Sequence, residues 1–330
     1  MPPISSFAFT PDPALPLLLK SVSRSFDLSI RLLPAGVREP VSVAYLLARA
    51  ADTLADTANV PAPERSRRLA TWAAAVDGRL EDAPAEVKRL GESFAPMQAD
   101  PRERALILAL PQCLDALAAL PPLDQADVRT VLRHITRGQM LDVDRFTNPA
   151  LLTSLANANE LDEYTYLVAG CVGEFWTSVC VRHLPHFAER PPSEMRALGR
   201  EYGKALQLVN ILRDAAADAG AGRSYMPADE VESLGLAAVR ARWLEKAHEG
   251  LASGMHYAQA VNNRRVRAAS ALPALLGVRT LALLHTAKET KTPPAKVPRS
   301  EVRALLLRMA ITLAARGPLK RMFDAASPAA

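Results

Sequence analysis

Hydrophobic positions recur with helical spacing along most of the chain, and no segment shows the strict alternation typical of a series of strands. The breaks between the periodic stretches carry proline and glycine, as at Pro121-Pro122 and from Gly220 to Gly222. The pattern predicts an all-α protein. The expected helices cover residues 13–30, 36–56, 62–80, 101–120, 124–146, 149–180, 192–217, 236–260, 264–286 and 300–315.

Two segments interrupt this pattern. Residues 57–100 are rich in alanine, proline and charge, and we interpret them as a peripheral excursion; residues 286–299 form a basic stretch that predicts a mobile loop. No internal repeat of fixed period is present. A length of 330 residues is compatible with one large domain, and we expect a single domain over residues 1–330.

Composition supports the helical interpretation and narrows the function. Hydrophobic residues make up 49% of the chain but aromatic residues only 5%, and the excess is alanine and leucine, which favour helix. A charged fraction of 23% excludes general disorder. The net charge of +5 permits an anionic ligand, but the basic residues are scattered among almost as many acids, so we expect no nucleic-acid partner.

The cellular location follows from cysteine usage and hydropathy. Cys113, Cys171 and Cys180 have no C-x-x-C spacing, which fits a reducing cytosol, and we expect neither a secretory signal nor a membrane-spanning helix. In residues 301–323 an apolar helical side is flanked by basic residues. Such an apolar side either packs on the helical bundle, which is the interpretation we prefer, or makes peripheral contact with the anionic inner face of a membrane. It carries Val302, Leu305, Leu306, Met309 and Leu313.

One predicted helix carries a polar stripe on an otherwise apolar surface. At about 100° per residue, four polar side chains in AYLLARAADTLAD share a narrow arc. They are Tyr45, Arg49, Asp52 and Asp56. The same device recurs in KALQLVNILRDAAADAGAGRSYMP, with Gln207, Asn210, Asp214 and Asp218 on one face.

The two stripes together point to a metal and a phosphate. One pair of aspartates four residues apart is usually a solvated face, but two pairs on apolar helices favour a functional site. Buried carboxylates that share a space repel one another unless cations lie between them. Magnesium suits such pairs, since it takes one or two protein carboxylates and completes its shell with water and phosphate. Arg49, Arg213 and Arg223 would then serve as phosphate donors.

Four segments of the chain resemble the squalene and phytoene synthases, the head-to-head prenyltransferases. They are SRSF, YLLARAADTLAD, YTYLVAGCVGEFW and LQLVNILRDAAADAGAGRSYMP, and the likeness runs from Ser23 through LPALLGVRTLALL. One departure is clear: many members carry glutamate before the last aspartate of each acidic motif, where this chain has Ala55 and Ala217.

The resemblance implies an isoprenoid synthase-type helical bundle around a central cavity. It assigns Asp52, Asp56, Asp214 and Asp218 as ligands of Mg²⁺, and Tyr164 as the tyrosine that assists the first half-reaction. The diphosphate sites would be lined by Ser23, Arg24, Tyr45, Arg49, Gln207, Asn210, Arg213 and Arg223. Gly170 and Gly173 would allow close approach of either an isoprenoid chain or a neighbouring helix.

The reaction that the resemblance implies is that of a squalene synthase. Two farnesyl diphosphates would give presqualene diphosphate, and hydride from NADPH would then give squalene. The GEFW and GQMLDVDRF segments look most like bacterial squalene-forming members. Lys296 occupies the place of a nicotinamide-site lysine, although a solvated loop lysine is an equal interpretation.

Other activities stay open at this point. Dehydrosqualene and phytoene synthases omit the hydride step. A chain-elongating prenyltransferase or a terpene cyclase is disfavoured, because neither motif has the adjacent aspartates of D-D-x-x-D. A non-catalytic helical lipid carrier or assembly subunit is the alternative from a different class.

Overall fold

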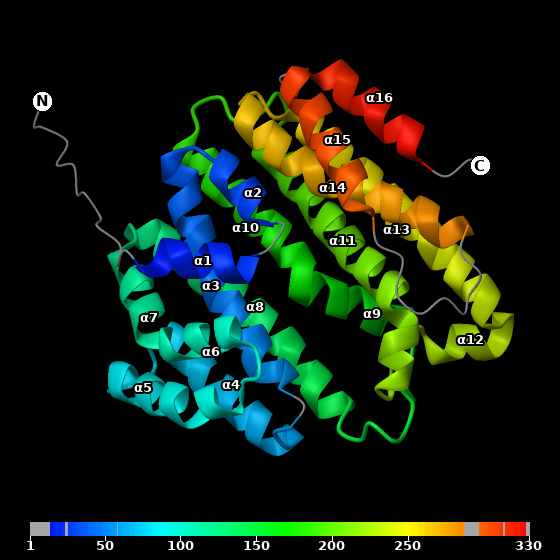
Figure 1. The fold of residues 1–330 in the computed structure, drawn as a ribbon. Coiled ribbons are helices and arrows are strands. Elements are labelled where there is room, and N and C mark those ends of the chain that lie inside the picture. Colours follow the sequence, from blue (N-terminus) through cyan, green and yellow to red (C-terminus); the bar gives the residue numbers. More distant parts are fainter. Residues whose placement is uncertain (1–13, 24–25, 58, 287–296, 313, 328–330) are drawn as a thin grey trace, which may run out of the picture. The chain divides into compact units, whose positions relative to one another are not determined.

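The computed structural model describes residues 14–23, 26–57, 59–286, 297–312 and 314–327. Within these ranges the predicted all-α fold is confirmed (Figure 1). The helices are α1 (Ala14–Ser23), α2 (Phe26–Leu32), α3 (Ala35–Asp56), α4 (Ala62–Val76), α5 (Ala83–Phe94), η1 (Ala95–Met97), α6 (Pro101–Leu108), α7 (Leu110–Ala119), α8 (Pro122–Arg145), α9 (Ala158–Thr165), η2 (Tyr166–Gly170), α10 (Cys171–His183), α11 (Pro192–Gly220), α12 (Ala228–Leu234), α13 (Leu236–Ala260), α14 (Arg264–Thr286), α15 (Arg299–Ile311) and α16 (Arg316–Ala326).

The helices group into two compact units. Unit 1 comprises Met1–Asp27 and Glu39–Arg133, and unit 2 comprises Leu28–Arg38 and His134–Ala330. Helices α3 and α8 each contribute residues to both units. That these units form a single domain around a central cavity stays a prediction.

Unit 1 has a well-packed core that includes part of the segment we expected to be peripheral. Trp72 of α4 is fully buried and donates a hydrogen bond from Nε1 to the Leu47 carbonyl of α3 at 3.3 Å. Helix α5, which the pattern missed, buries Val87 and Phe94 and packs on α4, α6 and α7. The peripheral interpretation of residues 57–100 is therefore wrong: these residues supply core side chains of this unit.

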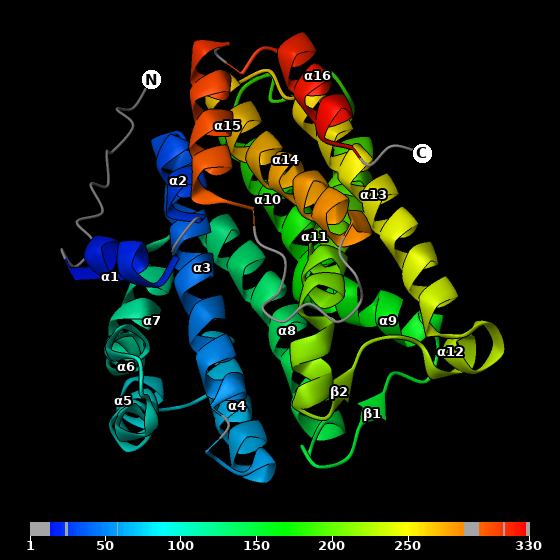
Figure 2. The ribbon, with the colours of Figure 1, turned by 45° about the vertical axis from the view of Figure 1, so that its right-hand side comes forward.

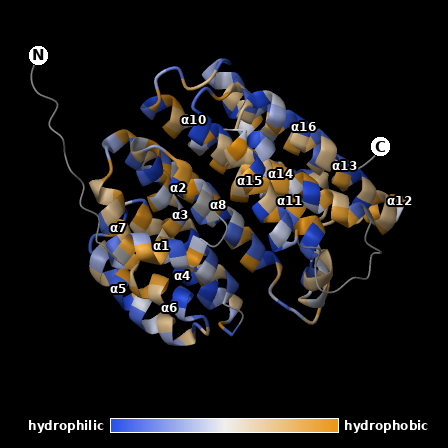
Figure 3. Cartoon of the chain, turned by 45° about the horizontal axis from the view of Figure 1, so that its top comes forward, coloured by the Kyte–Doolittle hydropathy of each residue, from blue (hydrophilic) through white to orange (hydrophobic). Residues whose placement is uncertain are grey.

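Unit 2 is built around α11. This helix packs on α10 and α13, and α14 packs in turn on α13 and α16 (Figures 1 and 2). Figure 3 shows hydrophobic residues alternating with hydrophilic ones along these helices, as expected for amphipathic segments of a core. Among the described residues, α14 is the one helix long and apolar enough to cross a membrane, over Arg264–His285. Of that apolar window, 61% is buried inside the structure.

Glycines set the contacts of α11 with α10 and with η2. A Cβ on Gly173 would lie 1.9 Å from the Gly199 carbonyl oxygen, and one on Gly203 would lie 2.2 Å from the Ala169 carbonyl oxygen. No side chain fits at these distances. Of the two roles considered for Gly173, close approach of a neighbouring helix is what the structure shows.

A short parallel pair of strands joins the segment before α9 to the segment after α11 (Figure 2). The sequence pattern predicted a helix over residues 149–180, but β1 (Thr153–Ser154) pairs there with β2 (Arg223–Ser224) before α9 begins. Gly222 makes the turn into β2: its φ is +77°, and a Cβ would lie 2.7 Å from the Pro149 carbonyl oxygen. Two-residue strands are too short for alternation to reveal them.

Candidate active site

The first acidic stripe lies in unit 1, on the last turns of α3. Its apolar neighbours Leu47, Ala51 and Leu54 are fully buried, whereas Asp52 is half-buried and Asp56 exposed. The helix is therefore held by its apolar side, and its acidic side chains remain reachable by a ligand.

A carboxylate from a different helix completes this stripe. Glu103, in the first turn of α6, accepts a hydrogen bond from Arg49 through Oε1 and one from Thr53 Oγ1 through Oε2, the latter at 2.5 Å. Arg49 also lies 3.7 Å from Asp52, measured from Nη1 to Oδ2. Burial by itself would lower the pKa of Arg49, but the hydrogen bond to Glu103 and the charges of Glu103 and Asp52 outweigh it and raise that pKa. Arg49 is thus fixed as a cation.

A cavity of about 310 Å³ opens at this place. Arg49, Asp56 and Glu103 line it, together with Gln98, which donates to Thr57 Oγ1 at 2.9 Å. Its other lining residues are Thr53, Thr57, Asn59, Met97, Ala99 and Asp100. A space walled by one guanidinium and several oxygens suits a hydrated cation and an anionic group.

The end of α1 borders the same stripe. Tyr45 donates a hydrogen bond to the Val22 carbonyl at 3.3 Å, which brings it beside Ser23. The Ser23 hydroxyl is buried and, within the part of the chain that the structure describes, makes no hydrogen bond. Arg24, the next residue assigned to a diphosphate site, lies outside the described residues.

The second acidic stripe lies in unit 2, on the C-terminal half of α11. Arg213 binds Asp214 with both ends of its guanidinium, at 2.9 Å from Nε to Oδ1 and 2.5 Å from Nη2 to Oδ2. Arg223 of β2 donates to Asp218 at 2.8 Å. The hydrogen bond to Asp214 and the nearby carboxylate charges raise the pKa of Arg213 despite its burial. The arginines that we predicted as phosphate donors here already neutralise the aspartates.

The two other polar residues of this stripe, Gln207 and Asn210, lie on α11 before Asp214. Asn210 is exposed and donates to Gln207 Oε1 at 3.4 Å. Both side chains therefore lie on the α11 face that carries the aspartates, as the helical spacing predicted.

Tyr164 in α9 belongs to an aromatic group in unit 2. Its ring stacks on that of Tyr225, with centroids 5.0 Å apart and planes at 24°, and Phe146 meets Tyr225 edge-on. The Tyr225 hydroxyl lies 2.9 Å from both carboxylate oxygens of Asp142. Neither Tyr225 nor Glu103 was singled out from the sequence, because each acquires its partners from a distant segment and belongs to no periodic motif.

Lys296, the residue proposed for the nicotinamide site, lies outside the described residues. Within the described ranges no group of three or more histidine, cysteine, aspartate or glutamate side chains is arranged to hold a metal ion. The aspartates of each motif are four residues apart on one helix, a spacing compatible with magnesium that takes one or two carboxylates together with a phosphate.

Comparison with known proteins defines first the fold class and then the family. A solved complex of TcSQS with the ligand BPH1237 has a TM-score of 0.74 and 20% identity, over 95% of this chain and 89% of that one, so the chain has the all-helical fold of that structure. The family model for squalene/phytoene synthase matches residues 19–303. The chain therefore belongs to the squalene/phytoene synthase family, a family of prenyltransferases, and the predicted resemblance is confirmed.

Curated relatives differ in how much of their length this chain covers. A bifunctional lycopene cyclase/phytoene synthase of Colletotrichum graminicola is 30% identical over 223 residues, which are 66% of this chain and 35% of that protein. The chain thus spans about a third of that relative. A presqualene diphosphate synthase of Rhodopseudomonas palustris is 28% identical over 316 residues, 92% of this chain and 98% of that protein.

Proposed function

We propose that the protein condenses two farnesyl diphosphates head to head into presqualene diphosphate and then reduces this product to squalene with hydride from NADPH. The observation that carries the proposal is that aspartates pair with arginines in both acidic motifs of this chain. The ion pairs are Arg49 with Asp52, Arg213 with Asp214, and Arg223 with Asp218. An arginine bound to a carboxylate is oriented in advance for the oxygens of a diphosphate.

The residues of both motifs fit magnesium. Asp52 and Asp56 form one candidate pair of ligands, and Asp214 and Asp218 form the other. Bound Mg²⁺ supplies positive charge to the departing diphosphate. An aspartate can exchange its arginine for a cation, since these ion pairs are partly exposed and therefore weak.

The protein's own residues supply the rest of the chemistry. Arg49, Arg213 and Arg223 stabilise the negative charge that develops on the leaving diphosphate as the allylic C–O bond breaks. Ser23, Tyr45, Gln207 and Asn210 orient the diphosphate oxygens by hydrogen bonds. Tyr164 acts in the first half-reaction, where the cation meets the double bond of the second substrate.

The reductive step is the finer part of this proposal. We assign Lys296 to the phosphates of NADPH because of its place in a basic segment. Release of presqualene diphosphate as the final product is a second candidate, favoured by the similarity over nearly the whole length of the Rhodopseudomonas palustris protein. Dehydrosqualene or phytoene would follow from proton loss in place of hydride transfer.

One incubation separates these possibilities. The full chain is mixed with farnesyl diphosphate and Mg²⁺, with and without NADPH, and products are identified by mass spectrometry. Squalene only with NADPH supports the full proposal, and presqualene diphosphate under both conditions supports the second candidate. Dehydrosqualene without NADPH would overturn the reductive step, and the absence of any Mg²⁺-dependent diphosphate release would favour a non-catalytic lipid carrier.

We further propose that the protein works in the cytoplasm as a peripheral protein at the inner face of the membrane. Helix α15 supports this location in a way the sequence did not indicate. Leu305, Leu306 and Met309 pack against the core of unit 2, as the preferred interpretation of this side predicted, while Leu307 is 61% exposed and Ile311 71% exposed. Arg303 and Arg308 are exposed on the same helix, and Leu313 lies outside the described residues.

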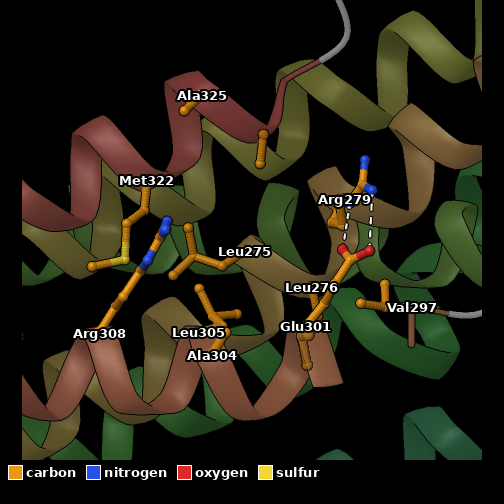
Figure 4. Close-up of a pocket in the computed structure, with 11 residues that line it drawn as sticks. Leu275, Leu276, Arg279, Val297, Glu301, Ala304, Leu305, Arg308, Met322 and Ala325 are labelled. Atoms are coloured by element: carbon orange, nitrogen blue, oxygen red, sulfur yellow. Dashed lines mark hydrogen bonds and ion pairs between the residues drawn. The ribbon is translucent and has the colours of Figure 1, made fainter. Parts of the chain in front are cut away.

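A pocket of about 340 Å³ lies under this helix, between α14, α15 and α16 (Figure 4). Leu275, Leu305 and Met322 form part of its wall, Arg279 and Glu301 form an ion pair at 2.7 Å across one end, and Arg308 extends beside Met322. Apolar and basic groups therefore occur together on this surface, as binding to an anionic bilayer requires.

Vesicle binding tests the location. The protein should co-sediment with vesicles containing phosphatidylglycerol at low salt and be released at high salt. Leu307→Ser with Ile311→Ser should weaken that binding, whereas Leu234→Ser with Leu236→Ser, at similarly exposed positions of 56% and 54%, should not. A full-length protein that ignores anionic vesicles would contradict the peripheral location.

A further inference from the structure

Three side chains of unit 2 form a connected polar group beside the second acidic stripe. Asp142 comes from α8, Tyr164 from α9 and Tyr225 from the segment directly after β2. Tyr225 contacts both of the others. Its hydroxyl lies 2.9 Å from each Asp142 oxygen. Its ring stacks on the ring of Tyr164, and the hydroxyls of the two tyrosines are within hydrogen-bonding reach of each other.

The direction of the hydrogen bonds follows from the chemistry of these groups. An ionised carboxylate only accepts hydrogen bonds, so the single proton of Tyr225 is donated to Asp142. The Tyr225 oxygen then has only lone pairs left, and its hydrogen bond with Tyr164 must use the Tyr164 proton. The chain of donation therefore runs from Tyr164 to Tyr225 to Asp142.

The surroundings keep Tyr225 a neutral phenol. Burial raises its pKa well above the usual range, and the charge of Asp142 raises it further, whereas the charge of Arg223 lowers it only in part. Phe146 packs edge-on against the same ring at 5.4 Å between centroids. Tyr225 thus keeps its proton and its orientation.

The β1–β2 pair connects this group to the metal motif. Arg223 lies in β2, and Tyr225 follows the strand directly, two residues further along the chain. Arg223 reaches Asp218 at 2.8 Å, and Tyr225 reaches Asp142. β2 and the residue directly after it therefore supply both the arginine that binds Asp218 and the partner of Tyr164.

We propose that Tyr225 and Asp142 are positioning residues that hold the Tyr164 hydroxyl by its proton. Tyr164 then presents oxygen lone pairs, and not a proton, to the reacting group. This inference rests on the proposed function, in which Tyr164 acts in the first half-reaction. It assigns to Tyr225 and Asp142 a role exerted through Tyr164 and not by contact with substrate.

The test is a double-mutant cycle in the full-length protein. Rates of presqualene diphosphate formation from farnesyl diphosphate and Mg²⁺ are measured for wild type, Tyr164→Phe, Tyr225→Phe and the double variant. We expect Tyr225→Phe to lower kcat by about tenfold or more, with KM within about twofold of wild type. In the Tyr164→Phe background the same substitution should have no further effect, because the residues act as one unit.

Tyr202→Phe is the matched control. Tyr202 is 8% exposed, as Tyr225 is, and its hydroxyl donates to the Ser270 carbonyl at 2.8 Å in the same unit. Loss of its hydroxyl should leave kcat unchanged. If Tyr225→Phe fails to fold, Asp142→Ala replaces it in the cycle. This substitution removes the acceptor and keeps both tyrosine rings.

The possible outcomes separate this inference from the proposed function. Wild-type protein that releases no diphosphate from farnesyl diphosphate overturns both. An active wild type with an equally active Tyr225→Phe variant overturns the positioning role alone. So does a loss in Tyr225→Phe that is repeated in full when Tyr164 is already phenylalanine, since a purely structural effect would add to that of Tyr164.

Discussion

Asp214 on α11 gives the sharpest test of the acidic motifs. Asp214→Asn keeps the size of the side chain and one acceptor oxygen, but it removes the charge that Arg213 binds and that Mg²⁺ requires. We expect presqualene diphosphate formation to fall by at least about 100-fold, the range seen when a group that stabilises transition-state charge is removed. Such a loss corresponds to about 2.7 kcal/mol in the activation free energy.

The effect on the free energy of unfolding should be far smaller. The Asp214 side chain is 35% exposed, and its partner Arg213 is the adjacent residue. The ion pair therefore does not connect segments that are distant in the chain. Partly exposed pairs of this kind contribute about 0–1 kcal/mol. In a protein of this length that change shifts Tm by no more than about 3 °C. A large loss of activity without a comparable loss of stability would therefore report on the site.

The assay follows diphosphate release over a titration of Mg²⁺, with Tm measured in parallel. Asp324→Asn is the control, since Asp324 is also partly exposed, at 53%, and pairs with Lys320 at 2.7 Å on α16, which contains no residue of either motif. It should behave as wild type. An Asp214→Asn variant that reaches a near wild-type rate at saturating Mg²⁺ would rule out the ligand role and leave Asp214 as a surface ion pair.

Two further predictions concern the carboxylate of Glu103 and the buried thiols of Cys113 and Cys171. Glu103→Gln should raise KM for farnesyl diphosphate several-fold and leave Tm nearly unchanged. The amide can still accept a hydrogen bond from Thr53, but it no longer holds Arg49 by charge. Steady-state kinetics would measure the change, and an unaltered KM would contradict the prediction. Burial raises the pKa of Cys113 and of Cys171 to about 12, so both thiols stay protonated below that pH. Iodoacetamide at pH 8 should therefore label neither cysteine until the protein unfolds, and rapid labelling of the folded protein would refute their burial.

The sequence predicted those features of the fold that depend on local periodicity. The long helices α3, α8, α11, α13 and α14 lie close to their predicted ranges, because each has an apolar face that repeats over several turns. The same periodicity placed the members of each polar stripe on one helix face. Local pattern was sufficient there, since residues four apart on a helix are neighbours whatever surrounds them.

Features that depend on distant contacts escaped the pattern. Helices α5, α12 and α16 are short, and α5 and α16 begin beside prolines, so their periodic signal is weak. The predicted helix over residues 101–120 proved to be two, α6 and α7. The pairing of Asp142 with Tyr225 spans 83 residues, and that of Arg49 with Glu103 spans 54, and neither is encoded in a spacing that can be recognised along the chain.

Glu103 also bears on the departure of this chain from its relatives. Where the resemblance to the family leads us to expect a glutamate in the first motif, this chain has Ala55, which is 5% exposed and whose carbonyl accepts a hydrogen bond from Arg65. A carboxylate at that position would be buried beside packed helices and would lose most of its hydration. Glu103 instead enters from α6, where Arg49 and Thr53 satisfy both of its oxygens. The first motif therefore retains a third carboxylate close to its arginine, supplied by a different helix, and the loss of the usual glutamate does not leave Arg49 without an anionic partner.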